Sequence, residues 1–312
     1  MHFSHLRIRI INGMKNYICI ALILAATATS CRTGDKFEQV PYSLETSTRM
    51  AGEIVNGAQS YFGHIKHDKV YNLAQGVNLL DLACLNTKGY SVQIYLFKVV
   101  MGTSTLAVAV PGTDKKADLP SVMAAGMNNE ATVLGAVNGD AQASDKSSTG
   151  IVYRNGTAVK STFSDDKGGF FATLKDGTAV IADQTDYATY RTSLYNAIGT
   201  RDRILTDGYP VTEEKPADAA RTFVAVSQDG MTVWLGVVDG VYFYYSNGIS
   251  RSDLASILKA AGAWNAALLN SGDVTTLIKR DDLGETLFPV FNSPSNNGIE
   301  KESVNALAII EN

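Results

Sequence analysis

Residues 220–240 read ARTFVAVSQDGMTVWLGVVDG, and this stretch decides the fold class. Two runs rich in β-branched and apolar residues, 222–227 and 232–238, flank a Gln-Asp-Gly turn. An Asp-Gly pair between such runs is a strong hairpin signal. Arg221 stands at the head of the first run, and Asp239 follows the end of the second. The stretch therefore predicts a β-hairpin that carries an arginine and a carboxylate at its strand ends.

The sequence around this hairpin predicts more strands than helices. Three helices are expected: an amphipathic one at 46–57, a short one capped by Asp118 with Pro120 in its first turn, and one from Ser250 to Gly262 with a capping-box-like start. Because no internal repeat is visible, we expect an α+β fold with mixed, mostly antiparallel β-sheets and a few packed helices. Further strands are expected at residues 77–82, 90–97, 105–110, 132–137, 150–153, 169–174, 179–181 and 266–269.

The N-terminal residues predict an export signal. Lys15 precedes an apolar run at 18–26, small residues follow at 27–30, and Cys31 stands next. The run is too short to cross a bilayer stably, so the pattern predicts a signal peptide that is cleaved before a lipidated Cys31. A plain secreted protein and a single anchor helix are the alternatives. The lipoprotein interpretation places the protein outside the cytoplasm, anchored to the bacterial envelope on its periplasmic or cell-surface side.

The pattern along the chain predicts four segments. We expect a signal peptide at 1–30, a lipidated tether at 31–45, an N-terminal helical lead-in at 46–73 and the main domain at 74–312.

The formal net charge of −4 argues against nucleic acid as a partner, because nucleic-acid binding needs a basic face. The expected partners are therefore a membrane, through the lipid, and a substrate.

Cysteine and histidine are scarce in the expected mature protein. Cys84 is the only cysteine beyond Cys31, so no disulfide is expected within the folded part. Only His64 and His67 remain, and both precede the main domain. A catalytic mechanism would rest on carboxylates, Asn, Thr and Arg unless that histidine pair is used.

Four stretches place polar side chains where apolar strands begin or end. Taken singly, the first three are more typical of a surface turn or a strand-edge ion pair. The fourth is a polar glycine-containing loop between two apolar strands. For this loop an anion-binding site and an ordinary surface loop are equally supported, because such loops direct backbone N–H groups toward one point. The candidate residues are Asn138, Gly139 and Asp140, then Arg221 and Thr222, then Asp239, and finally Asn270, Ser271, Gly272, Asp273, Thr275 and Thr276.

The order of these stretches resembles the phosphodiester glycosidase family. That family has an Asn-Gly turn after an Ala-rich strand, an Arg-Thr strand start, an Asp-Gly strand end, a helix and a glycine-rich loop in this sequence. The resemblance covers the chain from about residue 74 to its C-terminus and is closest at 220–277. Residues 292–295 and 303–307 resemble the family's closing strand. No single motif is specific to the family, but the order in which the motifs occur is.

The resemblance implies an enzyme that hydrolyses the bond between a sugar and a phosphodiester. In those terms Arg221 would bind the phosphate, and Asn138, Asp140 and Asp239 would line the pocket. The loop at 270–276 would close the pocket with hydroxyls and backbone donors.

Glycoside hydrolysis usually needs one carboxyl as acid and another as base or nucleophile. The candidates are Asp140, Asp239 and Asp273, with Asp239 and Asp140 favoured and their roles left open. These carboxylates could also hold a divalent metal, although no His or Cys ligand spacing supports one.

The chain departs from the family pattern at several positions. Asn270 replaces an Asp of the family's loop, Asp273 stands three residues later, and Val241 replaces an Arg. The late Glu-Arg of the family appears as Glu300-Lys301 or is lost. Three functions therefore stay open: a lipoprotein hydrolase acting on a sugar-phosphate diester in a glycan or envelope polymer, a non-catalytic module that binds a glycan or anionic polymer, and a structural envelope lipoprotein.

Overall fold

The computed structural model describes residues 42–166, 168–240, 242–281 and 287–312. The expected signal peptide, Cys31 and most of the tether lie outside these residues, as does Val241. Within the described ranges, no helix is both long enough and apolar enough to span a membrane.

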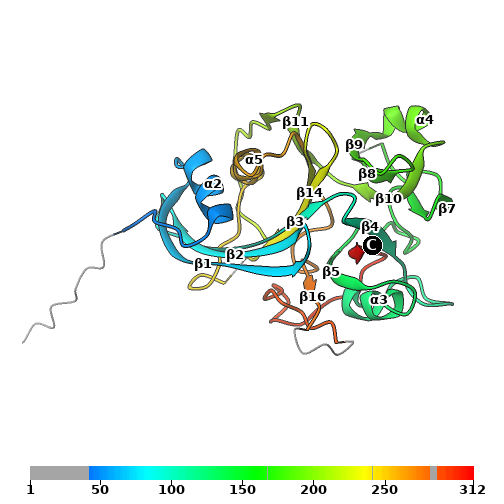
Figure 1. Ribbon diagram of the computed structural model, residues 1–312, viewed down its shortest axis with the longest axis horizontal. Helices are drawn as coiled ribbons and strands as arrows, with labels where there is room; N and C mark the ends of the chain where they lie inside the picture. Colours follow the sequence, from blue (N-terminus) through cyan, green and yellow to red (C-terminus); the bar gives the residue numbers. More distant parts are fainter. Residues whose placement is uncertain (1–41, 167, 241, 282–286) are drawn as a thin grey trace, which may run out of the picture. The chain divides into compact units, whose positions relative to one another are not determined.

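The described residues form three sheets in which each pair of neighbouring strands is antiparallel, so the expected α+β class is confirmed (Figure 1). The eight-stranded sheet has the order β1 (Phe62–Ala74), β2 (Val77–Asn86), β3 (Ser91–Val100), β14 (Thr232–Val238), β13 (Arg221–Val226), β15 (Asn265–Leu268), β11 (Arg203–Thr206) and β12 (Tyr209–Pro210). The four-stranded sheet has the order β16 (Leu277–Lys279), β5 (Val133–Asn138), β17 (Ala306–Glu311) and β4 (Ser104–Ala109). The five-stranded sheet has the order β7 (Thr157–Lys160), β6 (Val152–Arg154), β10 (Leu194–Thr200), β8 (Gly169–Leu174) and β9 (Ala179–Asp183).

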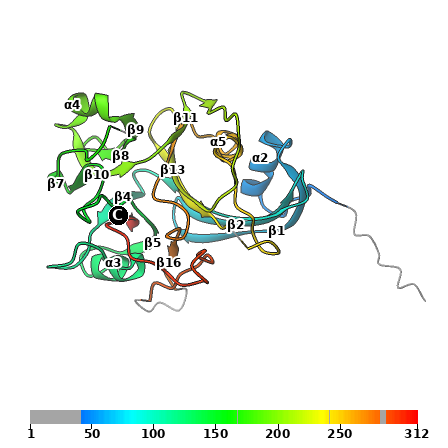
Figure 2. The ribbon, with the colours of Figure 1, turned by 180° about the vertical axis from the view of Figure 1, so that it is seen from behind.

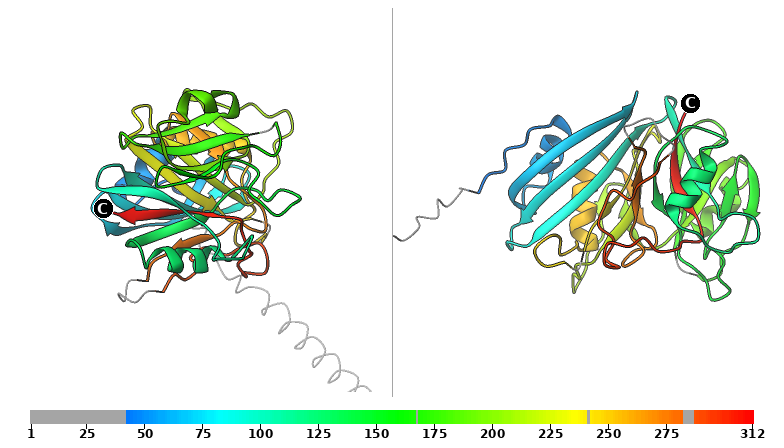
Figure 3. Two further views of the ribbon diagram at one scale, coloured as in Figure 1. Left: turned by 90° about the vertical axis from the view of Figure 1, so that its right-hand side faces the viewer. Right: turned by 90° about the horizontal axis from the view of Figure 1, so that it is seen from below.

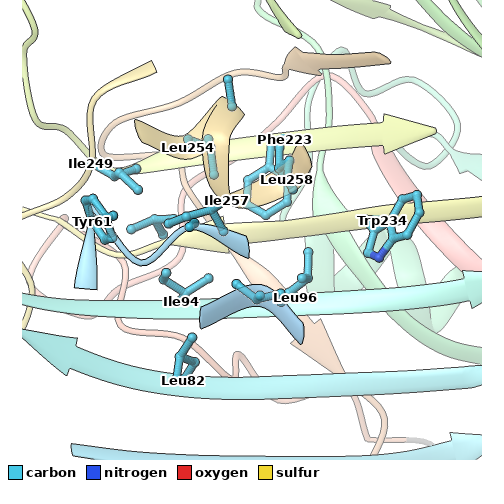
Figure 4. Packing of buried hydrophobic residues seen from close by; sticks show 14 of the residues in the cluster. Tyr61, Leu82, Ile94, Leu96, Phe223, Trp234, Ile249, Leu254, Ile257 and Leu258 are labelled. Carbon is cyan, nitrogen blue, oxygen red and sulfur yellow. The ribbon is translucent and has the colours of Figure 1, made fainter. Parts of the chain in front are cut away.

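Two helices, α2 (Arg49–Gly57) and α5 (Arg251–Ala260), cover one face of the eight-stranded sheet. Figure 2 shows α5 between α2 and β11, and Figure 4 shows Leu254, Ile257 and Leu258 of α5 beside side chains of the sheet. Burial of such side chains stabilises the fold by roughly 1.5–3 kcal/mol each. The two helices and this face of the sheet share one apolar core.

The opposite face of the eight-stranded sheet packs on the two smaller sheets. Successive side chains of a strand point to opposite faces, so Trp234 of β14 lies with the helices while Leu235 and Val237 lie in the core between sheets. Beyond the smaller sheets lie α3 (Pro120–Met127), and the short helices η1 (Gln184–Asp186) and α4 (Tyr187–Tyr190).

The hairpin and the late helix form as the sequence predicts. The strands β13 and β14 pair through the turn at Gly230, where the backbone φ of 72° favours glycine. Ser250 is the N-cap of α5, and its hydroxyl accepts the Asp253 N–H. In the region expected to be a helical lead-in, only Arg49–Gly57 is helical, and β1 begins at Phe62.

The expected cap of α3 is wrong. The N-cap residue is Leu119, and Asp118 instead forms an ion pair with Lys115. The carboxylate of Glu300 occupies the start of α3, where it accepts the N–H and the hydroxyl of Ser121 at 2.7 and 2.6 Å. A carboxylate at a helix N-terminus satisfies unpaired N–H groups and complements the helix dipole.

The C-terminal residues complete the four-stranded sheet. β17 lies between β5 and β4, and Figure 3 shows it as the red strand inside that sheet. The expected closing strand at 303–307 therefore exists, although its paired part begins at Ala306. Its N-terminal end meets the C-terminal end of β5, because Ala306 pairs with Asn138.

Candidate active site

Strand ends from the eight-stranded and the four-stranded sheets meet at one polar cluster. β5 ends at Asn138, β13 begins at Arg221 and β14 ends at Val238. The loop at 269–276 connects β15 of the eight-stranded sheet to β16 of the four-stranded sheet, so it crosses this junction. The topology thus brings together residues from all four candidate stretches.

Asn138 is the centre of the junction. Its side chain is 0% exposed, and its Oδ1 accepts the Thr222 hydroxyl at 2.8 Å and the Thr276 N–H at 2.9 Å. Its Nδ2 donates to the Asn270 carbonyl at 2.7 Å. The carboxamide therefore binds β5 to β13 and to the loop at 269–276, and these contacts turn it inward.

The loop residues are held by the same junction. The Asn270 N–H donates to the Gly139 carbonyl, and the Ser271 hydroxyl accepts the Thr222 N–H at 3.1 Å. Thr275 and Thr276 are fully buried, and the Thr275 hydroxyl lies 3.3 Å from that of Thr222. The Gly272 N–H donates to the Ala220 carbonyl at 3.2 Å. The loop is thus a rigid connection between the sheets.

Gly139 allows the closing strand to reach this junction. A Cβ at this position would lie 2.0 Å from Asn305 Oδ1 and 2.6 Å from Ile198 Cδ1, both far inside contact distance. Only a residue without a side chain permits this approach.

Asp140 organises the segment that follows it. Its carboxylate accepts four hydrogen bonds, from the N–H groups of Ala141 and Gly150 and the hydroxyls of Ser148 and Thr149. A carboxylate offers about four lone-pair sites, so these donors occupy all of them. Asp140 therefore holds the turn at 141–150 in place.

Asp239 is the carboxylate with the most perturbed environment at this junction. It is 1% exposed, and burial raises its pKa to about 6 even though three hydrogen bonds act to lower it. Asn292 Nδ2 donates to Oδ1 at 2.7 Å, while the Ser293 N–H at 2.9 Å and the Tyr245 hydroxyl at 3.0 Å donate to Oδ2. One acceptor site on Oδ1 is left over from the usual four.

Asn292 connects Asp239 to the Asn138 junction. Its Nδ2 also lies 3.1 Å from the Thr275 carbonyl, and its Oδ1 accepts the Leu277 N–H at 2.7 Å. Sequence reasoning did not select Asn292, Ser293 or Tyr245 as site residues. The available signals were an Asn-Ser-Pro turn at 292–294 and an aromatic run at 242–245.

A pocket of about 440 Å³ opens directly beside Asp239. It is lined by Tyr242, Tyr245, Ser293, Asn297 and Gly298. Two of these, Tyr245 and Ser293, are also hydrogen-bond donors to the Asp239 carboxylate. The Asp239 carboxylate therefore lies directly behind the pocket wall, in contact with two of the residues that form it.

Arg221 and Asp273 point away from Asp239. Arg221 donates to the Ile249 carbonyl at 3.2 Å and the Ala217 carbonyl at 2.9 Å, and burial lowers its pKa. Alternation along β13 places Arg221 on the helical face and Thr222 on the junction face. Asp273 is exposed and forms an ion pair with Lys301. The expected role of Arg221 as a phosphate ligand stays a prediction.

In the residues that the structure describes, no group of three or more His, Cys, Asp and Glu side chains could hold a metal ion. The three candidate carboxylates Asp140, Asp239 and Asp273 thus do not gather around one point.

Comparison with known proteins shows the family and the fold. A family model described as phosphodiester glycosidase matches residues 131–310, which contain the whole junction and the pocket. No curated protein matches the chain in sequence. Three solved structures resemble it at 12–19% identity, a level that shows the fold alone.

The first of these structures is the catalytic domain of zebrafish N-acetylglucosamine-1-phosphodiester alpha-N-acetylglucosaminidase, auto-inhibited by its pro-peptide. It matches with a TM-score of 0.58 and 19% identity, over 76% of this chain and 83% of that one. A hypothetical protein from Synechocystis matches with a TM-score of 0.53 and 12% identity, over 78% of this chain and 64% of that one. A protein from Burkholderia pseudomallei that is described as exported matches with a TM-score of 0.50 and 12% identity, over 71% of this chain and 74% of that one.

Proposed function

Because this chain belongs to the phosphodiester glycosidase family, we propose that it hydrolyses the bond between a sugar and the phosphate of a phosphodiester in a glycan or envelope polymer. One observation supports this proposal above the others: a buried carboxyl with a pKa near 6, Asp239, stands beside a pocket of about 440 Å³. Perturbed carboxyls in concave sites are typical of acid–base catalysis.

Asp239 serves in this proposal as the general base. It takes a proton from a water molecule, the hydroxide oxygen bonds to the sugar C1, and the C1–O bond breaks. The electron pair of that bond leaves with the phosphate monoester. In this proposal the water reaches the carboxylate from the pocket side, past Tyr245 and Ser293, which line the pocket and donate to Oδ2.

A single carboxyl suffices for this reaction because of the leaving group. Ordinary glycosidases use a second carboxyl to protonate a sugar alkoxide as it departs. A phosphate monoester has a second pKa of about 6, so it leaves as a stable anion without a proton from the protein. The saturated hydrogen bonding of Asp140 is therefore compatible with turnover.

The test is release of free sugar from N-acetylglucosamine phosphodiesters, with p-nitrophenyl phosphodiesters assayed in parallel. Free sugar accompanied by a phosphate monoester supports the glycosidase. A phosphate monoester formed without free sugar contradicts it and indicates a phosphodiesterase. A folded protein that binds the diester without turnover indicates the non-catalytic binding module.

The pH profile gives the role of Asp239. A base must be ionised, and the pKa of Asp239 is about 6, so kcat/KM should fall about tenfold per pH unit below 6 and level off above it. The Tyr245 hydrogen bond lowers this pKa, so Tyr245→Phe should move the acidic limb to higher pH. Activity that instead declines as the pH rises through 6 would assign Asp239 the role of acid.

We also propose that the mature protein is anchored to the envelope through lipidated Cys31, since its signal pattern ends at this cysteine. The Cys31→Ser protein should leave the membrane fraction, and mass spectrometry of the wild-type N-terminal peptide should show the mass of attached acyl chains. Cys84→Ser is the matched control and should stay membrane-bound. A Cys31→Ser protein that still sediments with membranes would contradict lipid anchoring.

A further inference from the structure

Four consecutive aromatic residues, Tyr242, Phe243, Tyr244 and Tyr245, follow the Asp-Gly at the end of β14. We call residues 242–245 the aromatic turn. Phe243 is 65% exposed and Tyr244 is 91% exposed, so two large ring faces are open to solvent beside the pocket that Tyr242 and Tyr245 line. Exposed aromatic side chains that gather at a pocket are typical of a binding surface.

Hydrogen bonds hold the aromatic turn in one conformation. The N–H groups of Tyr245 and Ser246 donate to the Tyr242 carbonyl at 2.9 and 2.8 Å, and the Tyr242 N–H donates to the Ser246 carbonyl at 2.9 Å. Asn247 Nδ2 donates to the Phe243 carbonyl at 3.0 Å. The rings are thus presented by an ordered backbone, which lowers the entropy cost of binding a ligand against them.

Two side chains join the aromatic turn to the rest of the site. The Tyr242 hydroxyl donates to the Ser295 carbonyl at 3.3 Å, and the Tyr245 hydroxyl donates to Asp239. The Tyr95 hydroxyl lies 3.0 Å from that of Tyr245. A ligand that rests on the aromatic turn is therefore placed at a defined position relative to the Asp239 carboxyl.

We propose that the aromatic turn is the subsite for the sugar ring of the substrate, with the Tyr244 ring stacking on the C–H face of a pyranose. Phe243 supports that ring edge-to-face, because the two ring centroids lie 5.1 Å apart at an interplanar angle of 81°. This assignment rests on the proposed function and names the part of the substrate that the site recognises. The π face of an aromatic ring carries partial negative charge and attracts C–H groups, which a pyranose presents on its face. Ser293 and Asn297 on the pocket wall supply polar groups for the ring hydroxyls.

The chemistry of the pocket favours a sugar over a purely apolar ligand. Tyrosine supplies a large contact area with little side-chain entropy to lose, and its hydroxyl can also bond to a polar ligand. The pocket wall combines the tyrosine rings with an amide side chain, a serine hydroxyl and a glycine backbone. A sugar ring has a C–H face that fits the aromatic side chains and an edge of hydroxyls that fits the polar groups of the pocket wall.

The experiment measures binding separately from turnover. Two ligands are compared by calorimetry on the purified full chain carrying Asp239→Asn: the methyl diester of N-acetylglucosamine 1-phosphate, and dimethyl phosphate, which has no ring. The double variant Phe243→Ala/Tyr244→Ala should raise the Kd of the sugar ligand about tenfold and leave that of dimethyl phosphate unchanged. Tyr209→Ala is the matched control, since Tyr209 is 77% exposed on the edge strand β12.

In the catalytically intact chain, the same double variant should raise KM with little change in kcat, because stacking acts equally on substrate and transition state. An unchanged Kd for the sugar ligand, or an equal loss for both ligands, would overturn the subsite. The absence of turnover in the wild-type chain would overturn the proposed reaction alone, because the sugar-dependent change in Kd is read without catalysis.

Discussion

Replacing Asp239 by asparagine is expected to lower kcat by about 10²- to 10⁴-fold, the usual contribution of a positioned general base. An amide cannot take a proton from water at neutral pH, whereas its shape keeps the pocket wall intact. The measurement is the initial rate of sugar release under saturating substrate, with circular dichroism to establish that the variant is folded.

Three carboxylates provide controls for this prediction. Asp176→Asn, in the exposed hairpin between β8 and β9, should leave kcat unchanged. Asp273→Asn removes an exposed partner of Lys301, so it should change stability by about 0–1 kcal/mol and leave kcat nearly unchanged. Asp140→Asn should lower the free energy of unfolding, because Asp140 holds the turn at 141–150, and should affect kcat less than Asp239→Asn does. If Asp239→Asn retains wild-type turnover, or Asp273→Asn abolishes it, the assignment of the base to Asp239 is wrong.

Replacing Asn138 by alanine is expected to destabilise the fold by about 3 kcal/mol or more. The change removes the partner of the Thr222 hydroxyl and of the Thr276 N–H, both in buried hydrogen bonds, and of the Asn270 carbonyl, in a partly buried one. Each buried polar group that loses its hydrogen bond costs about 1–3 kcal/mol. A loss of this size is large against the typical total stability of about 5–15 kcal/mol.

Urea unfolding followed by tryptophan fluorescence measures this loss, with Asn129→Ala as the control. Asn129 is an exposed turn residue after α3, so its replacement should change the free energy of unfolding by less than about 0.5 kcal/mol. Equal losses in the two variants would mean that Asn138 does not hold the sheets together. A selective loss of activity in Asn138→Ala, without loss of stability, would instead place its carboxamide in substrate binding.

Local patterns predicted the elements whose residues carry their own signals. The β13–β14 hairpin has an Asp-Gly turn between apolar runs, and α5 has a serine cap and helical spacing. β1 lacks such a signal: its residues include His, Lys and Asp, and register shifts interrupt its pairing with β2. β10, whose run includes Asn196 and Gly199, was also not expected. Their strand conformation depends on neighbours that supply the hydrogen bonds.

The cap of α3 shows the same limit for a single side chain. Asp118 stands next to the helix in sequence and matches the usual N-cap pattern. Glu300, which lies 179 residues from its partner Ser121, occupies the helix start instead. The local N-cap rule identifies a suitable side chain next to the helix. The tertiary fold decides which carboxylate lies at the start of α3.

The class of fold followed from the sequence, because hydrophobic periodicity and turn residues act over a few positions. The family followed from the resemblance in the order of the four candidate stretches, which also named the residues that meet at the junction. The tertiary structure alone decided what each polar residue does there. Asp140 is saturated by Ala141 and residues 148–150, Arg221 lies on the helical face of β13, and Asp239 stands beside a pocket. The three partners that lower the pKa of Asp239 lie 6, 53 and 54 residues along the chain, and the burial that raises it depends on how the sheets pack. Desolvation is a property of packing, so no local pattern contains it.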